Sequence, residues 1–507
     1  MTASRDVETL RSEPSADLPA TRRAWLVPAI LLVITVVGFA FRWAGMDESF
    51  YGDELFTYQI ATSDSLRGAL SMVRSDLEIT PPLFFVLAWG LQHLGDPFLW
   101  LRATSLVAGT ATIPLTYLLG ARTVSRRAGL VAAALMALSP LGIFYSSEAR
   151  AYALMTVLVL LSTLVLLRAL DSSGWVWWVV LAGLYTAAMY SHYTAAFVLL
   201  AQAAWALWTR RDRWLPLVLS MGGAALLFLP WLPAFLADGK APPQKIIGIL
   251  VPFSPGAFTG QTARLLMGSI FARLENVPGL WAAALFTVGL LLGLVGWFVA
   301  ARPRRPHRLT ARHALVVVIA LAAPLGAAGY SLVSDDMFLA RNLLSSLPAL
   351  YVVIGAVLVA GSRRVVIVAV ALAVAGMGWA AVQTLNPDNQ RPQNREAAEY
   401  IVARAAPGDT VLQILPVVGP PATALDVHLP ETLRGVHVRP GVTDPPGWQP
   451  PTGTVFGVGS TGDLAQLRDL LPPGYRETAS QTWEGGRYSG VLEGERLTVY
   501  TFEPGSP

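Results

Sequence analysis

The sequence AWLVPAILLVITVVGFAFRW occupies Ala24–Trp43 and carries a single charged residue, Arg42. A helix that crosses a bilayer needs about 20 mainly apolar residues, so this stretch predicts a membrane span. It is too long for the apolar region of a signal peptide and lacks a clear small-residue cleavage site, so we interpret the span as uncleaved. Residues 1–23 mix arginines with carboxylates and predict a disordered cytoplasmic tail.

Similar apolar runs continue through most of the chain, at 100–121, 128–146, 151–170, 175–191, 193–209, 215–236, 279–301, 313–333, 339–361 and 365–384. Only 14% of the residues are charged, against roughly 25% in a soluble protein. The predicted fold class is therefore an all-α polytopic membrane protein with about eleven transmembrane helices in residues 24–384. The chain has no cysteine, which excludes disulfides, thiolate metal sites and cysteine nucleophiles.

The run Pro81–Leu94 decides the orientation. It is short, begins with two prolines and contains Gln92 and His93, so we expect it to lie at the membrane interface. With this run outside the bilayer, every predicted cytoplasmic loop carries arginine, and the carboxylates of residues 44–99 face the other side. This places the chain in the cell membrane with a cytoplasmic N-terminus and an extracytoplasmic C-terminus. The net charge of +4 then reflects membrane topology and indicates no nucleic-acid partner.

Residues 385–507 predict a small extracytoplasmic α/β domain. An amphipathic run at 395–404 and a segment at 463–471 predict helices, and 411–415, 454–458 and 497–502 predict strands. A second long outer loop is expected at 237–278, in addition to the first at 44–99. No glycine-rich nucleotide-phosphate loop occurs anywhere in the chain.

Polar groups at membrane depth are costly and by default mark function. Here they gather on the predicted outer side, in the first outer loop and at the ends of the neighbouring spans: Asp53, Glu54, Arg102, Glu148, Arg150, Tyr152, His192 and Arg341. Carboxylates offer a general base, and arginines offer planar donors to a phosphate. Simpler roles remain open: a salt bridge between Glu148 and Arg150, an interfacial anchor at Arg341, and a hydrogen-bonded helix break at His192. The acidic pairs could hold a divalent metal, but no spacing requires one, and no residue is assigned as a metal ligand.

Several of these residues fall in recognisable strings: YGDELFT at 51–57, TPPLFF at 80–85, LRATS at 101–105, SP at 139–140, YSSEARAY at 145–152, SHY at 191–193 and the segment 341–348. In this order they resemble the bacterial membrane glycosyltransferases of family 39. These enzymes have the GT-C fold, which protein O-mannosyltransferases and lipid A aminoarabinose transferases share. Two positions depart from the family: Thr80 stands where a histidine often precedes the proline pair, and Asn342 where an aromatic residue often follows the arginine.

The resemblance implies transfer of a hexose or pentose from a polyprenyl-phosphate carrier to an extracytoplasmic acceptor, which is a cell-envelope glycan, a glycolipid or a protein. It makes Asp53 the general base and Glu54 its motif partner. The other positions would shape the donor pocket: Arg102, Glu148, Arg150, Tyr152, Arg341 and, as a further substrate-binding candidate, His192. Phosphate is a good leaving group, so we expect a single displacement with inversion. Two alternatives stay open: a lipid-linked sugar transporter or flippase, and a non-catalytic scaffold whose tail binds cell-wall polymer.

Overall fold

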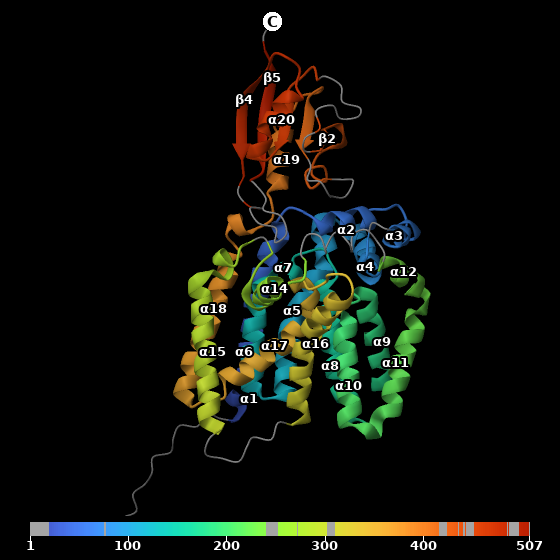
Figure 1. Ribbon diagram of the computed structural model, residues 1–507, viewed down its shortest axis with the longest axis vertical. Coiled ribbons are helices and arrows are strands. Elements are labelled where there is room, and N and C mark those ends of the chain that lie inside the picture. The colour runs from blue at the N-terminus through green and yellow to red at the C-terminus, as the bar shows by residue number, and fades with distance from the viewer. Residues whose placement is uncertain are drawn as a thin grey trace, which may run out of the picture.

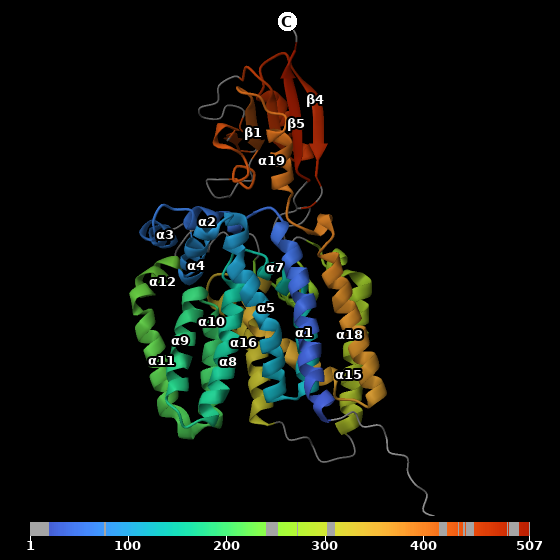
Figure 2. The same ribbon diagram turned by 180° about the vertical axis from the view of Figure 1, so that it is seen from behind.

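The computed structural model describes residues 20–75, 78–239, 252–270, 272–301, 310–414, 423–433, 435–439, 442, 451–483, 485 and 496–505. These residues form a helical bundle and, at one end of it, a small sheet domain (Figure 1). Figure 2 shows α1, α5 and α18 along the opposite side of the bundle. Residues 1–19 of the predicted tail and 240–251 of the predicted second outer loop lie outside the described residues.

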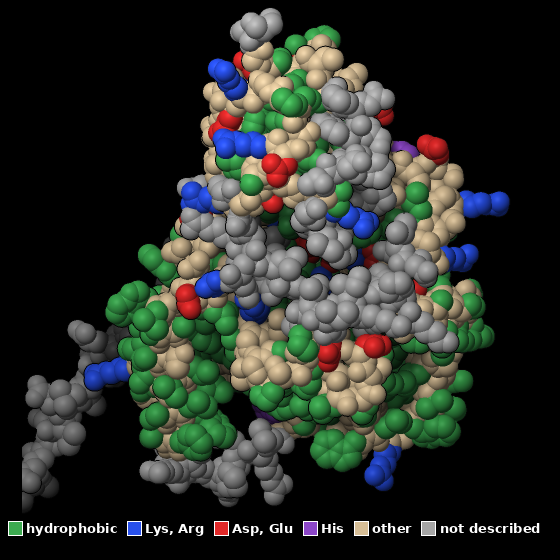
Figure 3. All heavy atoms as spheres, turned by 45° about the horizontal axis from the view of Figure 1, so that its top comes forward, with side chains coloured by type: hydrophobic (Ala, Val, Ile, Leu, Met, Phe, Trp, Pro, Cys, Tyr) green, Lys and Arg blue, Asp and Glu red, His purple; other side chains and the backbone are tan. Residues whose placement is uncertain are grey.

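The first half of the bundle contains α1 (Ala20–Ala44), α2 (Asp53–Ala61), α3 (Leu66–Val73), α4 (Leu83–Leu91), α5 (Pro97–Thr123), α6 (Arg126–Ala137), α7 (Pro140–Ser146), α8 (Tyr152–Asp171), α9 (Val176–Ser191) and α10 (Ala195–Thr209). The second half contains α11 (Trp214–Phe228), α12 (Leu232–Asp238), α14 (Pro255–Met267), α15 (Leu280–Ala301), α16 (Ala311–Val333), η6 (Ala340–Ser346), α17 (Leu347–Leu358) and α18 (Arg363–Gln383). Hydrophobic side chains cover much of the flanks of this bundle (Figure 3), as expected of a surface that faces lipid.

The membrane-spanning character of the bundle agrees with the sequence, but the number of full-length spans is lower. Every predicted run is helical, and 8 helices among the described residues are long and apolar enough to cross a bilayer. The run 128–146 forms α6 and α7, which are bent by 61° and raise the count to 9 if they make one span. The runs 175–191 and 193–209 form helices of 16 and 15 residues, fewer than the roughly 20 that a straight crossing needs. The chain is a multi-pass membrane protein in either case.

Arg42, the charged residue of the predicted first span, stabilises the bend between α6 and α7. Ser139 caps α7, and Pro140 at its first position cannot continue α6. The carbonyls that this break leaves free at Met136 and Ala137 each accept a hydrogen bond from the guanidinium of Arg42, at 3.0 Å. The Nε of Arg42 also donates to Ser146 Oγ at 3.0 Å. A fully buried arginine thus satisfies backbone groups that lipid could not.

The run Pro81–Leu94 forms α4 and the short helix η2 (Gln92–Leu94), which together are too short for a span. They lie with α2 and α3 at the end of the bundle nearest the sheet domain (Figure 1). Three of the arginine-bearing loops meet one another: Arg312 Nη2 lies 2.7 Å from Asp171 Oδ2, and its Nη1 donates to the Arg122 carbonyl at 3.4 Å. The structure therefore groups these loops as the predicted topology requires, while the compartment that each end faces stays a prediction.

The C-terminal residues form the predicted α/β domain. Its sheet has the order β2-β1-β3-β5-β4, with bounds β1 (Thr410–Ile414), β2 (Val436–Val438), β3 (Val455–Gly459), β4 (Tyr475–Thr482) and β5 (Thr498–Pro504). β1 pairs in parallel with β2 and β3, and β5 runs antiparallel to β3 and β4. The helices are α19 (Asn394–Val402) and α20 (Leu464–Asp469). The sequence did not predict β2 and β4, because β2 has three residues and β4 is largely polar and exposed.

Candidate active site

The acidic pair Asp53 and Glu54 opens α2, directly after Gly52. Gly52 has φ of 58° and occupies the N-cap position, a conformation that a side chain would disfavour. The turn lets the chain leave the first span and start a helix at the end of the bundle near the sheet domain. Consecutive helix residues point about 100° apart, so the two carboxylates face different partners. Their environments differ sharply as a result.

Asp53 faces Arg341, which follows it by 288 residues in the sequence. The Arg341 Nη1 donates to Asp53 Oδ2 at 2.7 Å, and the two side chains keep 27% and 38% of their surface exposed, respectively. Partial burial raises the pKa of Asp53, but the positive charges of Arg341 and Arg150 outweigh it and hold that pKa below its ordinary value. Asp53 is therefore ionised at neutral pH and still accessible from solvent.

Glu54 is fully buried and faces Arg102 of α5. The guanidinium binds both oxygens of the carboxylate at 2.7 Å, through Nε and Nη2. Its remaining hydrogen bonds go to the carbonyls of Met46, Glu48 and Ser49. These bonds use all of the guanidinium donors of Arg102, so the side chain holds the first outer loop against α5. Arg102 therefore has no free N–H in this arrangement, and its predicted part in shaping the donor pocket stays a prediction.

The segment 147–151 between α7 and α8 makes hydrogen bonds to α2, the helix that begins with the acidic pair. The Ala149 amide donates to Glu54 Oε1 at 2.8 Å, and Thr57 of α2 donates its hydroxyl to the Ala149 carbonyl at 2.8 Å. Arg150 binds both oxygens of Glu78, at 2.6 and 3.1 Å, and also Thr80 Oγ1 at 3.0 Å. The ion pair between Glu148 and Arg150 that the sequence left open is not formed, because Arg150 takes a partner from the first outer loop.

Glu148 is buried, and its Oε2 has no hydrogen-bond partner among the described residues. Burial first, and then the negative charges of Glu54 and Asp53, raise the pKa of Glu148 to about 8. The carboxyl group is therefore mostly neutral at pH 7. A neutral acid is a hydrogen-bond donor, unlike the ionised carboxylates beside it.

Tyr152 and His192 lie beside Arg341. The Arg341 guanidinium carbon is 5.9 Å from the centroid of the Tyr152 ring, and the rings of Tyr152 and His192 are 5.1 Å apart. His192 lies between α9 and α10, and its Nδ1 is 2.9 Å from the Thr194 hydroxyl. Burial and the charges of Arg150 and Arg341 lower the pKa of His192 to about 3, so the ring is neutral. The hydrogen-bonded helix break foreseen for His192 is present, and its role as a substrate ligand stays a prediction.

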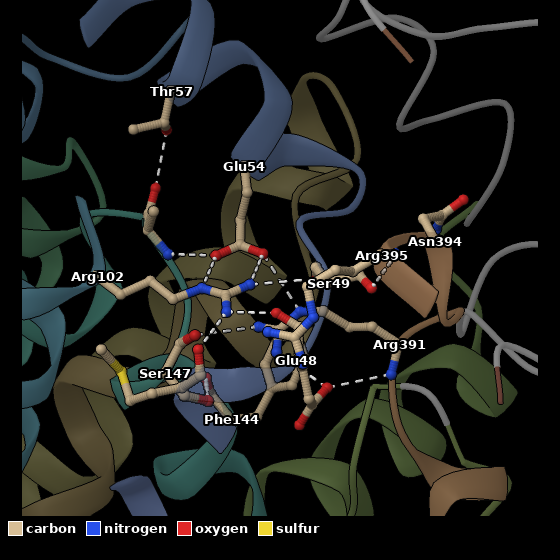
Figure 4. Close-up of polar contacts among 12 residues, drawn as sticks. Glu48, Ser49, Glu54, Thr57, Arg102, Phe144, Ser147, Arg391, Asn394 and Arg395 are labelled. Carbon is tan, nitrogen blue, oxygen red and sulfur yellow. Dashed lines mark hydrogen bonds and ion pairs between the residues drawn. The ribbon is translucent and has the colours of Figure 1, made fainter. Parts of the chain in front are cut away.

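Sequence reasoning missed Arg391, and it did not single out Glu48 and Glu78 among the loop carboxylates. Arg391 comes from the segment before α19, outside the bundle, yet its side chain is buried against Glu54 and Glu48. Figure 4 shows Glu54 extending from α2, with Arg102 and Arg391 beside it. The local sequence NPDNQRPQN at 386–394 has no periodicity that would set this arginine apart from an ordinary loop charge.

The divalent metal that the sequence left open has no evident ligand set in this cluster. No group of three or more His, Asp or Glu side chains that could hold a metal ion occurs within the described part of the chain. Asp53 and Glu54 each pair with arginine, whereas Mg²⁺ or Ca²⁺ would need convergent oxygen ligands. We therefore derive no chemistry through a metal.

The comparison with known proteins agrees with this arrangement. Residues 80–236 match the family model described as dolichyl-phosphate-mannose-protein mannosyltransferase. That stretch of the chain is similar to this mannosyltransferase family. The match covers α4 to α12 and includes Arg102, Glu148 and Arg150, and it confirms the resemblance inferred from the sequence. No curated protein sequence matches the chain significantly.

Solved structures confirm the GT-C fold over nearly the whole chain. ArnT from Cupriavidus metallidurans bound to undecaprenyl phosphate aligns with a TM-score of 0.52 and 15% identity, over 95% of this chain and 98% of ArnT. Its apo state gives a TM-score of 0.53 and 13% identity over the same shares. The apo oligosaccharyltransferase of Archaeoglobus fulgidus gives 0.50 and 13% identity, over 77% of this chain and 59% of its own. The mannosyltransferase match and the GT-C fold together identify a membrane glycosyltransferase.

Proposed function

We propose that the chain transfers a sugar from a polyprenyl-phosphate carrier to a hydroxyl of an extracytoplasmic acceptor, with Asp53 as the general base. The observation that carries the proposal is the partly exposed ion pair between Asp53 and Arg341. Of the two neighbouring carboxylates, Glu54 is enclosed by protein donors, whereas Asp53 keeps an exposed side chain and one arginine partner. Only Asp53 is placed to meet a hydroxyl from solvent.

The donor site in this proposal lies around Arg341. Apart from the bond to Asp53, its guanidinium N–H groups have no hydrogen-bond partner among the described residues. A planar guanidinium with free donors suits the oxygens of a phosphate. Two other buried groups lack a partner in the same part of the structure, Glu148 Oε2 and Arg150 Nε. We expect a bound phosphate or sugar hydroxyl to satisfy some of these groups, because buried polar atoms are seldom left unpaired. The neighbour ArnT has been solved with undecaprenyl phosphate, a ligand of this class.

The proposed reaction is one displacement. The Asp53 carboxylate takes the proton of the acceptor hydroxyl while that oxygen attacks the anomeric carbon. The bond from the anomeric carbon to the phosphate oxygen breaks, and its electron pair leaves with the polyprenyl phosphate. Arg341 stabilises the charge that grows on this leaving group. Attack from the face opposite the phosphate inverts the anomeric configuration.

The test uses purified protein, radiolabelled polyprenyl-phosphate sugars and a membrane extract that supplies the acceptor. Asp53→Asn keeps the shape of the side chain and removes the base, so turnover should fall by about 10²–10⁴-fold while donor still binds. Asp64→Asn is the matched control, because Asp64 is an exposed carboxylate of the same outer loop. Normal turnover in Asp53→Asn would remove it as the base.

The same assay separates the alternatives. A transporter or flippase should move labelled lipid across vesicles without forming a glycosylated product, and it should tolerate Asp53→Asn. A scaffold should bind wall polymer and leave the donor unchanged. Product formation that depends on Asp53 is expected of the transferase alone.

A further inference from the structure

The C-terminal domain reaches into the acidic cluster through Arg391. This residue lies between η7 (Pro387–Asn389) and α19, and its side chain is only 1% exposed. Its Nη1 donates to Glu48 Oε2 at 3.0 Å, and its backbone N–H donates to the same oxygen at 3.1 Å. Its Nε lies 3.3 Å from Glu54 Oε2, and its guanidinium carbon is 4.5 Å from the centroid of the Phe144 ring. One guanidinium thus joins the first outer loop, α2 and α7 (Figure 4).

Glu54 consequently lies between two arginines, Arg102 from α5 and Arg391 from the C-terminal domain. Each is within 3.3 Å of Glu54 Oε2, and all three side chains are almost fully removed from water. A buried carboxylate depends on such partners, because an uncompensated buried charge is strongly unfavourable. The direction of Glu54, and with it the start of α2 where Asp53 lies, is therefore set by both domains.

We propose that Arg391 is a positioning residue of the transfer site, so that the extracytoplasmic α/β domain completes this site by fixing Glu54 and the first turn of α2. For its activity readout the inference rests on the function proposed above. It assigns the domain a part in catalysis in place of an independent role as a polymer-binding module.

A nearby contact provides the control for a residue that only tethers the C-terminal domain to the first outer loop. Arg395 of α19 also reaches the first outer loop, where its Nη1 lies 2.7 Å from Asp47 Oδ1. That pair is open to solvent, with 35% and 82% of the two side chains exposed, and such pairs contribute little. Arg395 therefore links the same two parts of the chain without touching Glu54.

The charges around Glu54 predict a signature in the pH profile. Glu54 is faced by Arg102 from α5, by Arg391 from the C-terminal domain, and by the Ala149 N–H and Glu148 from the α7–α8 junction. Arg391 is itself also paired with Glu48. Burial raises the pKa of Glu54, and the charges of Arg102 and Arg391 lower it below its ordinary value. Loss of the Arg391 charge should raise this pKa, and the acid limb of activity should move to higher pH.

The experiment compares Arg391→Gln and Arg391→Lys with the matched controls Arg395→Gln and Arg395→Lys in the full chain. For Arg391→Gln we expect kcat to fall by about 10²-fold, because small displacements of reacting groups cost that much, with little change in KM. Arg391→Lys keeps the charge but loses the fork, so it should recover part of kcat and the wild-type acid limb. Arg395→Gln should stay within about twofold of wild type, since an exposed pair contributes little.

Several outcomes would overturn the inference. Full activity of Arg391→Gln would do so, and so would equal losses in Arg391→Gln and Arg395→Gln with an unshifted pH profile, which indicate a tether. If Arg391→Gln does not fold, Arg391→Lys decides: a kcat and pH profile equal to those of Arg395→Lys would reject the positioning role.

A thermodynamic cycle separates this inference from the proposed function. Thermal unfolding of Arg391→Gln, Glu54→Gln and the double variant requires no substrate. We expect a double variant less destabilised than the sum of the single variants, because each single change leaves its partner unbalanced. Additive effects would overturn the contact, whatever the activity. Lack of sugar transfer by the wild type, with coupling present, would instead reject the proposed function alone.

Discussion

The unpartnered carboxyl group of Glu148 makes the stability of the protein depend on pH in a predictable direction. The pKa of this group is about 8 in the folded protein, against 4.5 for an ordinary glutamate side chain, chiefly because of burial. Between these two values the unfolded chain releases the proton and the folded state retains it. Stability from this group is therefore fully present below about pH 4.5 and is lost as the pH rises to about 8. A difference of this size corresponds to about 5 kcal/mol, as an order of magnitude.

Glu148→Gln removes the titration while keeping the size and the hydrogen-bonding capacity of the side chain. The variant should match the wild type in thermal unfolding near pH 5 and unfold at a higher temperature near pH 9. The assay is thermal unfolding in detergent at intervals from pH 5 to pH 9. Glu399→Gln serves as the control, because the Glu399 side chain is 72% exposed and should add no such difference. Parallel curves for Glu148→Gln and wild type over the whole range would refute a buried neutral acid at this position.

Other expectations follow from the remaining contacts. Arg341→Lys should weaken binding of polyprenyl phosphate about 10–100-fold in an equilibrium binding assay, because a lysine lacks the planar fork; unchanged affinity would make residue 341 a point charge only. Glu78→Gln leaves Arg150 buried without its counter-charge and should cost about 3–5 kcal/mol, seen as a lower unfolding temperature in detergent; an unchanged temperature would contradict the pair. In intact cells, an impermeant thiol reagent should label His93→Cys and spare Arg126→Cys, and the reverse pattern would invert the predicted topology.

The sequence was sufficient for the membrane helices of this fold because lipid imposes a simple rule. A spanning segment must satisfy its own backbone hydrogen bonds and present apolar side chains, so apolar runs translate directly into helices. The interface character of Pro81–Leu94 followed from its length, prolines and polar residues. The runs at 175–191 and 193–209 are already shorter in the sequence than a straight crossing needs, and the structure forms helices of 16 and 15 residues from them. Pro140 marks the break between α6 and α7 in the sequence, but the arginine that binds the freed carbonyls lies about 95 residues earlier in the chain and could not be inferred.

The sequence predicted most of the residues of the candidate site but not the ion pairs that they form. Charges on one face of a membrane protein stand out, so Asp53 and Arg341 could be named from the sequence alone. Their partnership across 288 residues could not, since partner choice depends on how the helices pack. The adjacency of Glu148 and Arg150 even suggested the wrong pair: the backbone between α7 and α8 directs Arg150 to Glu78 instead. The sequence around Arg391 has no pattern that would identify this residue as part of the site.

The same physics explains why one carboxylate of the acidic pair is suited to chemistry and the other to structure. Glu54 receives hydrogen bonds from Arg102 and the Ala149 amide and lies beside Arg391, so displacing it would expose several buried groups at once. Asp53 has one arginine partner and partial access to water, and it can exchange that partner for a substrate at small cost. In the proposed reaction, a fixed, dry residue beside an accessible, ionised one would give the preorganisation that a displacement at an anomeric carbon requires. The buried ion pairs around Glu54 contribute little net stability, and they fix the start of α2, where the proposed base Asp53 lies.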